Sequence, residues 1–474
     1  MRAFFTTLLI VCVSIINSSA KTWLVGAARA YTLPSQVSGL VNDGDTVAID
    51  SGTYNKDVAF WTANNLVLEG VGGMARLKSE GLNYGGKAIW VINGNNTVVN
   101  YIEFSECTCT DNNGAGIRQQ GINLTIYKCL FDSNQEGILA DDDTTSDILI
   151  EYTEFKYNGA GDGYSHNLYI NHVHSLTFQY NYSHLANVGH ELKSRAYNNY
   201  IWYNRFADEA TGTASRDLDI PNGGFTIILG NEIEKGPNAQ NENVMEYGLE
   251  GLTNPSTQLY LVNNTIVSDR SNTLFVDLEA GTSLWKGYNN IFAGVGTILS
   301  GSATTTDTSN NWYISIANAG FVNAANYDYH LLSTSGAINN GTDPGYANTY
   351  SLTPLYEYVQ PTNDTLRIIN GALDIGAHEY GITTTAVYPP TSNNPSILVY
   401  PNPSDGEVNI SWPVSQGIRT VELFDYSGRL ISEKQIESVA DKAMFTEWHL
   451  TAGVYFLRVI ANNKILEQPL VIQH

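Results

Sequence analysis

The chain repeats a short apolar segment with a similar ending: VVNYIEF (98–104), IYKCLF (126–131), LIEYTEF (149–155), FQYNY (178–182), IWYNRF (201–206), ILGNEI (228–233), LVNNTI (261–266) and KGYNNIF (286–292). Phe104, Phe131 and Phe155 are 27 and 24 residues apart. Periods in the twenties, without a helical period of 3.6 residues, are typical of a β-solenoid in which each coil supplies two or three short strands.

One asparagine of this segment also recurs, at positions 181, 204, 231, 264 and 290. An asparagine at the same turn of every coil can form a ladder of side-chain hydrogen bonds and tolerates a left-handed backbone. We therefore interpret this column as scaffold.

A second strand recurs between the first segments, in GAGIRQQ (114–120), EGILADD (136–142), HNLYINH (166–172), HELKSRA (190–196) and RDLDIPN (216–222). Its apolar anchors share one register, namely Ile117, Ile138, Leu168, Leu192 and Leu218. Alternation with a period of two then points two columns of side chains outward. The first column is Arg118, Leu139, Tyr169, Lys193 and Asp219, and the second is Gln120, Asp141, Asn171 and Arg195.

Over residues 21–381 the chain resembles the bacterial right-handed parallel β-helix proteins of the polysaccharide-lyase type. The resemblance runs from DGDTVAIDSGTY (43–54) through GHELKSRA (189–196) to DYHLLSTSGAINNGTDP (328–344) and LDIGAHEY (373–380). It implies a right-handed parallel β-helix. This group contains lyases, hydrolases, epimerases and proteins of unknown activity, so the chemistry has to be argued from the site.

The two ends of the chain carry export signals. Residues 1–20 have the charged, apolar and small-residue order of a signal peptide. Residues 382–396 form a Thr/Pro/Asn-rich linker. Residues 397–474, with ILVYPNPSDGEVNISW and LTAGVYFLRVI, resemble the C-terminal sorting domain of the type IX secretion system. This implies a small β-sandwich-like domain, a Bacteroidota-type cell, and a protein that is secreted or held at the outer cell surface by type IX export.

Composition narrows the possible partners. The 474 residues carry a formal net charge of -23, which argues against binding to nucleic acid or to an anionic membrane. No segment after the signal is long and apolar enough to span a membrane. The odd cysteine count, Cys107, Cys109 and Cys129, predicts buried thiols rather than a disulfide framework. We expect an all-β monomer.

Residues 163–205 form a locally positive stretch in this acidic chain. They contain Lys193, Arg195 and Arg205, opposed only by Glu191, and five of the nine histidines. Such a stretch favours a site for an acidic sugar. Of these histidines, His174 and His184 fit a structural role better, because they lie beside the aligned strand.

The cluster suits β-elimination of a uronic acid, which needs a cation, a base and an acid. Arg195 suits carboxylate binding. Lys193, with its pKa lowered by Arg195, or His190 could be the base, and Tyr169 or His190 could be the acid. Asp219 beside Lys193 would raise that pKa and shifts the role of base toward His190 or Tyr169. The predicted catalytic residues are Lys193, Arg195, His190, Tyr169 and His166, and the predicted substrate-binding residues are His172, Asn171, Glu191, Asp217, Asp219 and Arg118.

Other functions remain open. Asp217 and Asp219 form an i, i+2 pair about 7 Å apart and predicted to face the same way, which falls within the range of inverting glycoside hydrolases. A C5-epimerase would use the same site as a lyase. A non-catalytic glycan-binding solenoid or adhesin would need no base.

Asp141, Asp142 and Asp143 raise the question of Ca²⁺, because hard cations bind clustered carboxylates. No spaced ligand set accompanies them, so we assign this run to a solvated or loop-capping turn. We predict no metal site and no certain cofactor, with Ca²⁺ as a weak possibility.

Overall fold

The computed structural model describes residues 20–381 and, in the C-terminal part, residues 398–400, 408–411, 418–425, 429–436, 442–445, 450, 453–461 and 464–472. The predicted linker (382–396) lies outside the described residues. The predicted signal peptide (1–20) does so as well, apart from its last residue.

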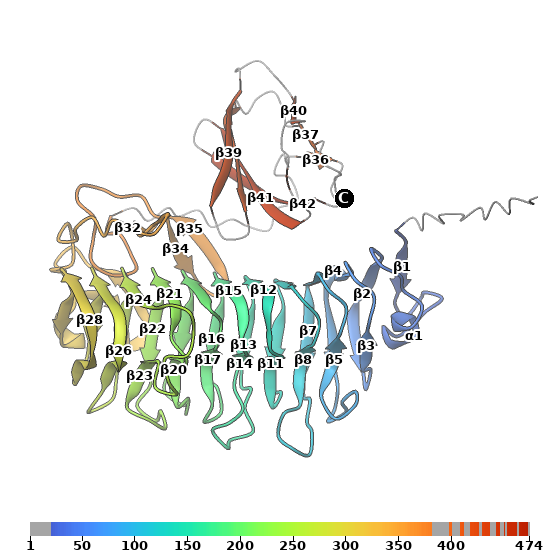
Figure 1. Cartoon of the computed structure of the whole chain (residues 1–474), viewed down its shortest axis with the longest axis horizontal. Coiled ribbons are helices and arrows are strands. Elements are labelled where there is room, and N and C mark those ends of the chain that lie inside the picture. Colours follow the sequence, from blue (N-terminus) through green and yellow to red (C-terminus); the bar gives the residue numbers. More distant parts are fainter. Residues whose placement is uncertain are drawn as a thin grey trace, which may run out of the picture.

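Strands β1–β29 form one 29-stranded sheet, in which each strand pairs in parallel with the equivalent strand of the next coil (Figure 1). The pairings define three faces of a solenoid. Face 1 consists of β3 (Ala59–Trp61), β5 (Ala88–Ile92), β8 (Ala115–Gln119), β11 (Glu136–Ala140), β14 (Leu168–Ile170), β17 (His190–Ser194), β20 (Arg216–Ile220), β23 (Asn243–Tyr247) and the first parts of β26 (Leu274–Tyr288) and β28 (Thr297–Ser309).

The other two faces continue each coil. Face 2 consists of β1 (Thr22–Val25), β2 (Thr46–Asn55), β4 (Val67–Lys78), β6 (Thr97–Asn100), β9 (Leu124–Tyr127), β12 (Asp143–Glu151), β15 (Val173–Gln179), β18 (Asn198–Trp202), β21 (Gly224–Leu229) and β24 (Thr257–Val262). Face 3 consists of β7 (Ile102–Ser105), β10 (Leu130–Asp132), β13 (Glu154–Lys156), β16 (Tyr182–His184), β19 (Arg205–Ala207), β22 (Glu232–Lys235), β25 (Thr265–Ser268), β27 (Ile291–Ala293) and β29 (Trp312–Ile314).

The interior of the solenoid is filled by side chains that repeat from coil to coil. Phe104, Phe131 and Phe155 stack with ring centroids 5.1 and 4.9 Å apart. All three are fully buried, as expected where the same apolar position is met once per coil. At the N-terminal end the short helix α1 (Ser35–Ser38) adds Val37 to this core.

The asparagine ladder is confirmed. The Asn231 carboxamide oxygen accepts the backbone N–H of Asn204 at 2.8 Å, and its Nδ2 donates to the Ile201 carbonyl of the preceding coil at 2.9 Å. In the next coil, Asn264 Oδ1 accepts from the backbone N–H and from Nδ2 of Asn231. Each side chain therefore satisfies backbone groups that the turn would otherwise leave unpaired.

The strands of face 1 depart from strict alternation near their beginning. In β23 the consecutive residues Val244 and Met245 are both fully buried in the core, and in β26 Phe275 and Val276 are as well. In β17 and β20 the pairing joins His190 to Arg216 and then Leu192 to Leu218, and omits the residue between. Two neighbouring side chains thus point inward in these coils.

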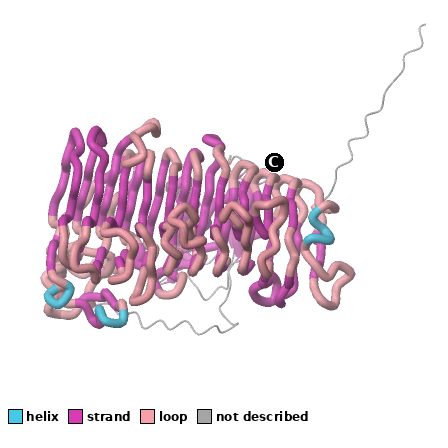
Figure 2. Tube along the Cα trace, turned by 90° about the horizontal axis from the view of Figure 1, so that it is seen from below, coloured by secondary structure: helices cyan, strands magenta, loops and turns pink. Residues whose placement is uncertain are grey.

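After β29 the chain runs back along the outside of the solenoid. This closing segment (315–381) contains η1 (Ile316–Asn318), β30 (Phe321–Asn323), η2 (Ala324–Asn326), β31 (Asp328–Leu331), β32 (Tyr346–Ala347), β33 (Tyr350–Ser351), β34 (Tyr356–Val359) and β35 (Asn363–Leu366). Phe321 and Leu331 pack on Ile291 of face 3, and Leu352 and Tyr356 join a cluster with Tyr203. Figure 2 shows the short helices at the two ends of the solenoid.

A buried ionic contact fastens the closing segment. His378 lies 2.5 Å from Glu232 of β22 through Nε2 and 3.2 Å from Glu357 of β34 through Nδ1. Burial lowers the pKa of His378, but the two carboxylates outweigh it and raise that pKa to about 9. Glu232 is also paired with Arg205 of β19.

The C-terminal strands form two antiparallel sheets. One contains β36 (Leu398–Tyr400), β37 (Val408–Ser411) and β40 (Lys442–Phe445), and the other β38 (Ile418–Asp425), β39 (Leu430–Gln435), β41 (Gly453–Ala461) and β42 (Lys464–Ile472). Val408 and Ile410 of the first sheet share a core with Val421 and Leu457 of the second. The predicted all-β fold class, a parallel β-helix followed by a small sandwich-like domain, is confirmed.

The structure also bears on the predictions for the cysteines and for membrane-spanning segments. Cys107, Cys109 and Cys129 are free and buried, as expected for thiols that pack as small apolar groups. Burial raises the pKa of Cys129 to about 12. None of the helices in the described part of the chain has the length and apolar character that a membrane span requires.

We predict that Asn231→Ala destabilises the solenoid. The change leaves the Ile201 carbonyl and the Asn204 amide groups without their partner, which costs about 1 to 3 kcal/mol for each buried group left unpaired. Thermal melting followed by circular dichroism should show a clear fall in melting temperature. The control is Asn238→Ala, whose exposed Nδ2 donates to the Ala210 carbonyl. Equal melting temperatures for the two variants would contradict a structural role of the ladder.

Candidate functional site

Face 1 carries the predicted column of outward side chains. The strand register places Tyr169 of β14, Lys193 of β17 and Asp219 of β20 beside one another in successive coils. Lys193 Nζ lies 3.1 Å from Asp219 Oδ2 and 5.6 Å from the centroid of the Tyr169 ring. The predicted vertical contact among these three residues is therefore confirmed.

Arg195 joins this column from the end of β17. Its Nε donates to the Tyr169 hydroxyl at 2.9 Å, and its NH1 donates to Asn222 Oδ1 at 2.5 Å. The Tyr169 hydroxyl accepts from a permanently charged guanidinium, so its own hydrogen can be donated to another group. This hydrogen bond fixes the Tyr169 hydroxyl and the Arg195 guanidinium side by side.

Glu250 is the residue that sequence reasoning missed. It stands in the turn after β23, between Gly248 and Gly251, which both have positive φ. Its carboxylate accepts from Lys193 Nζ at 2.9 Å and from Arg195 NH2 at 2.5 Å. The repeat indicates only its coil, because NVMEYGLEG (243–251) continues the face 1 repeat one coil beyond RDLDIPN (216–222), whereas the turn that holds Glu250 has no repeating position.

Glu250 changes the electrostatics of the site. Lys193 and Arg195 face two carboxylates, Asp219 and Glu250, so the stretch that looked positive in the sequence is locally balanced. The Glu250 side chain is 48% exposed, whereas those of Lys193 and Arg195 are 11% and 14% exposed. Glu250 is therefore the most exposed of the three side chains, and Lys193 and Arg195 reach the surface beside its carboxylate.

The pKa of Lys193 is raised, whereas from the sequence we expected Arg195 to lower it. Burial lowers it, but Asp219 and Glu250 outweigh burial and raise it above its ordinary value. Burial raises the pKa of Asp219 and of Glu250, but their partners outweigh burial and hold both pKa values below the usual range. These partners are His190 and Lys193 for Asp219, and Lys193 and Arg195 for Glu250. Lys193 is thus a cation at neutral pH, and Asp219 and Glu250 are anions.

His166 and His190 lie beneath the column at the beginning of β14 and β17. Their rings stack with centroids 4.4 Å apart, and the backbone N–H of His190 donates to His166 Nδ1 at 3.0 Å. His190 Nε2 lies 3.3 Å from Asp219. Burial lowers the pKa of both histidines, so both are neutral at pH 7, and the neutral His166 carries its proton on Nε2.

Two predicted substrate-binding residues are not on the surface. Glu191 and Asp217 occupy the extra inward position of β17 and β20, and neither residue has exposed surface. Glu191 accepts from the Ala186 N–H at 2.9 Å, and Asp217 lies 3.6 Å from the buried Lys235. The prediction that Asp217 and Asp219 face the same way is wrong, because strict alternation does not hold there.

Of the remaining predicted residues, Asn171 follows β14 at the position beside Arg195. Arg118 of β8 lies three coils before Lys193 and two before Tyr169, and it pairs with Asp141 of the next coil. His172, next to Asn171, lies 2.8 Å from Asp142.

The two histidines assigned to structure have partners outside face 1. His174 lies 2.7 Å from Asp147 of β12, and His184 lies 3.1 Å from Glu154 of β13.

The Asp141–Asp143 run does not converge on one point. Asp141 bonds to Arg118 and Gln120, Asp142 to His172, and Asp143 to Thr145. These contacts fit the predicted role in a turn.

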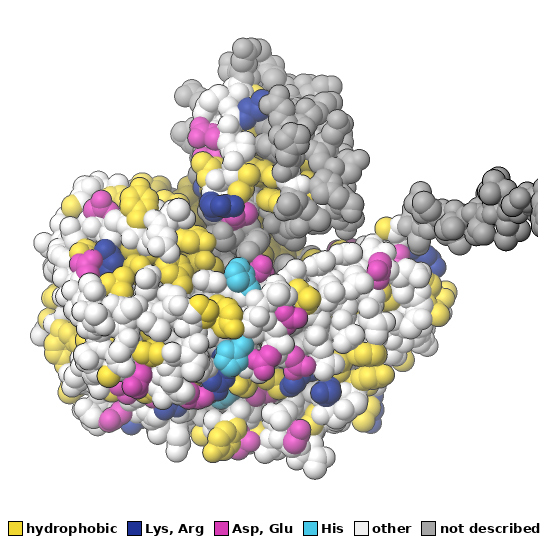
Figure 3. All heavy atoms as spheres, viewed as in Figure 1, with side chains coloured by type: hydrophobic (Ala, Val, Ile, Leu, Met, Phe, Trp, Pro, Cys, Tyr) yellow, Lys and Arg dark blue, Asp and Glu magenta, His cyan; other side chains and the backbone are white. Residues whose placement is uncertain are grey.

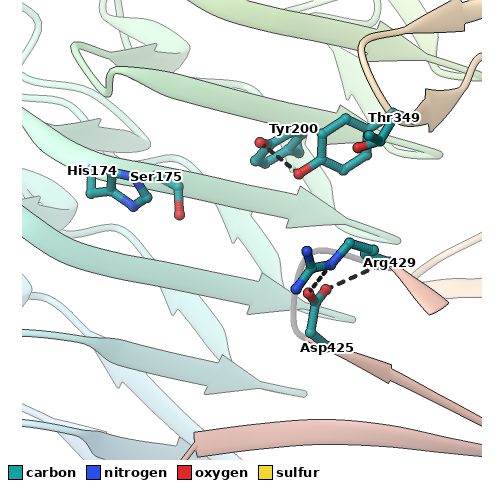
Figure 4. A pocket seen from close by; sticks show the side chains of 7 residues that line it. His174, Ser175, Tyr200, Thr349, Asp425 and Arg429 are labelled. Atoms are coloured by element: carbon teal, nitrogen blue, oxygen red, sulfur yellow. Dashed lines mark hydrogen bonds and ion pairs between the residues drawn. The ribbon is translucent and has the colours of Figure 1, made fainter. Parts of the chain in front are cut away.

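The candidate site reaches solvent through Glu250, whose side chain is 48% exposed. In Figure 3, charged and histidine side chains gather in a band along the solenoid. Two hollows lie elsewhere. One, of about 220 Å³, is lined by His174, Ser175, Tyr200, Thr349, Tyr350, Asp425 and Arg429 (Figure 4). The other, of about 300 Å³, is lined by Tyr157, Leu185, Asn187, Thr211, Gly212 and Thr213. The titratable column lines neither.

Comparison with known proteins identifies the C-terminal part of the chain. Residues 398–473 match the family of the secretion system C-terminal sorting domain. No curated protein and no solved structure matches the chain. The sorting domain engages the type IX secretion machinery, and the protein is exported to the cell surface or released.

The opposite environments of Asp217 and Asp219 predict opposite effects of pH on stability. Burial raises the pKa of Asp217 well above its ordinary range, with Asp208 and Glu234 adding to the rise and Lys235 opposing it. The stability tied to neutral Asp217 is complete below the pKa of an unfolded aspartate, about 3.9, and is lost as pH rises. Asp217→Asn should therefore gain about 1 to 3 kcal/mol at pH 8 and little at pH 4.

Asp219→Asn is the matched variant. The folded pKa of Asp219 is lowered, so its contribution is present above the unfolded pKa and is lost as pH falls. This variant should lose about 3 kcal/mol at pH 8, and progressively less as pH falls below the unfolded pKa of about 3.9. Melting temperatures across pH 2 to 8 provide the measurement. Variants that change in the same direction with pH would refute the assignment of inward and outward positions.

Proposed function

We propose that this exported protein is an enzyme that acts on a polysaccharide containing uronic acids and cleaves it by β-elimination. One observation carries the proposal: Lys193 and Arg195 hold a solvent-reaching carboxylate, that of Glu250, directly beside the Tyr169 hydroxyl. A uronate places a carboxylate next to an acidic C5–H group, so the same cations could bind it when Glu250 moves aside. The resemblance to β-helix lyases and the export of the chain agree with this substrate.

Each residue then has a defined task. Arg195 and Lys193 neutralise the uronate carboxylate, which makes the C5 proton easier to remove. Tyr169, half-buried beside both cations, takes the C5 proton as a phenolate. As the C5–H bond breaks, its electron pair forms the C4–C5 double bond and the C4–O bond breaks. Tyr169 then returns the proton to the glycosidic oxygen that leaves. His190 and Asp219 position Lys193 from below.

A glycoside hydrolase is supported less well. Such an enzyme needs one carboxylic acid that remains protonated until it donates to the leaving group. Asp217 is enclosed in the solenoid, and the neighbouring cations keep the pKa values of both Asp219 and Glu250 low. The pair of carboxylates at the surface therefore lacks the general acid.

Two alternatives share the binding step. A C5-epimerase would use the same cations and return the proton to the opposite face of the sugar. A glycan-binding solenoid would use them without any proton transfer. We also propose a Bacteroidota-type cell as the source, from the resemblance of the sorting domain.

We predict that the chain produces unsaturated uronates from at least one anionic polysaccharide among alginate, pectate, glucuronans and glycosaminoglycans. Ultraviolet absorbance of the new double bond is the measurement. Arg195→Ala should reduce kcat/KM by about 100-fold or more, because removal of one charge-assisted contact in a transition state has an effect of this size. Lys193→Ala and Tyr169→Phe should also remove most activity.

The control is Arg76→Ala, which removes an exposed arginine paired with Glu103 on another face. Its activity should equal that of the wild type. Saturated reducing sugars in place of unsaturated products, with activity lost in Asp219→Asn, would replace the lyase by a hydrolase. Binding without turnover on all four substrates would favour the glycan-binding solenoid.

We also predict that Glu250→Gln lowers KM for the carboxylated substrate severalfold. Glutamine keeps the shape of the side chain but no longer competes as an anion for Lys193 and Arg195. Because Glu250 is half exposed, the fold should be retained. Initial rates over a range of substrate concentrations separate KM from kcat. A large loss of kcat at unchanged KM would instead make Glu250 part of the proton-transfer machinery.

A further inference from the structure

A second cluster of titratable side chains lies on the other side of the solenoid, where the closing segment packs on face 3. His330 belongs to β31, Glu357 to β34, and His378 to the stretch that follows β35. One possible ligand atom from each of the three residues lies within 4.8 Å of the others. None of the three takes part in the site on face 1.

The remaining polar atom of each side chain already has a partner. His378 Nε2 lies 2.5 Å from Glu232, and His330 Nδ1 lies 2.7 Å from Asp328. Glu357 Oε1 accepts the Glu379 N–H at 2.8 Å. Metal-binding histidines characteristically donate their second nitrogen to a carboxylate, which fixes the ring and its tautomer.

These partners leave three atoms as possible ligands: His330 Nε2, His378 Nδ1 and Glu357 Oε2. The rings of His330 and His378 are stacked with centroids 4.0 Å apart, so the His330 ring has to turn before its Nε2 can point at an ion shared with His378. His378 Nδ1 and Glu357 Oε2 are 3.2 Å apart, close to the separation of about 3.3 Å between neighbouring ligands of a tetrahedral zinc ion. The His330 side chain is 55% exposed. A small movement of this surface side chain can therefore complete the set, and an ion can enter from solvent.

We propose that His330, Glu357 and His378 bind a divalent transition-metal ion of the Zn²⁺ type, with water in the fourth position. Two imidazole nitrogens and one carboxylate oxygen suit Zn²⁺, whereas Ca²⁺ prefers six to eight oxygen ligands. The expectation of no metal site, made from the sequence, is replaced by this proposal.

The ion would fasten the closing segment to the solenoid. All three ligands come from the closing segment, and the partner of His378, Glu232, belongs to β22 and is held by Arg205 of β19. Binding of the ion releases the proton that His378 Nδ1 otherwise shares with Glu357, while Nε2 keeps its proton toward Glu232. This role does not depend on the activity proposed for face 1.

The test uses the full chain purified without a polyhistidine tag and titrated with Zn²⁺. We expect one ion per chain by calorimetry and by metal analysis after dialysis, and a higher melting temperature. Co²⁺ in place of Zn²⁺ should give visible absorption bands of a four-coordinate nitrogen and oxygen site. Ca²⁺ should produce none of these effects.

His330→Ala should weaken Zn²⁺ binding at least 100-fold and remove the Co²⁺ bands, without unfolding the protein, because this side chain is exposed. The matched control is His174→Ala. His174 is also an exposed histidine, 51% exposed and 2.7 Å from an aspartate, Asp147, and its loss should leave binding unchanged.

Glu357→Gln provides a second variant that keeps the side-chain shape and should also weaken binding. The proposal is overturned if the wild type binds no Zn²⁺, if His330→Ala binds as tightly as the wild type, or if Ca²⁺ binds equally well.

Discussion

The parallel register of the coils is the constraint on which the structure depends. Each strand bonds to its equivalent in the next coil, so a residue type at one position of the repeat stacks on itself about every 4.8 Å. The stacked phenylalanines fill the interior in this way, and the asparagine ladder closes the turns. A slip of one residue would unpair the ladder and expose the core, which makes the register firmly defined.

The same register builds the candidate site on face 1. Tyr169, Lys193 and Asp219 meet because they occupy one position in three successive coils, and Arg195 lies two residues farther along the strand of Lys193. An exposed sheet face offers an extended polymer many equivalent coils to lie across. The turn that follows β23 then supplies Glu250, which balances the charge of Lys193 and Arg195.

The solenoid also contains polar groups that its repeat would not require. The extra inward position of face 1 holds Glu191 and Asp217, and burial raises the pKa of both carboxyl groups well above the usual range. On face 3, Glu232, Glu357 and His378 join the closing segment to the coils. Buried groups of this kind are unfavourable unless they are paired or neutral, so they mark positions where the fold is held in one arrangement.

The odd cysteine count predicted the buried thiols, and the C-terminal motifs predicted the sorting domain. From the repeat, the sequence alone determined the fold class, the asparagine ladder and the neighbours Tyr169, Lys193 and Asp219. These follow because equal positions in successive coils are neighbours in space. Only the tertiary structure decided that Asp217 and Glu191 point inward, since a local break in alternation leaves no mark in a pattern of period two. It also decided the place of Glu250 and the cluster of His330, Glu357 and His378, because a turn and a returning segment bring together residues whose spacing in the chain has no period.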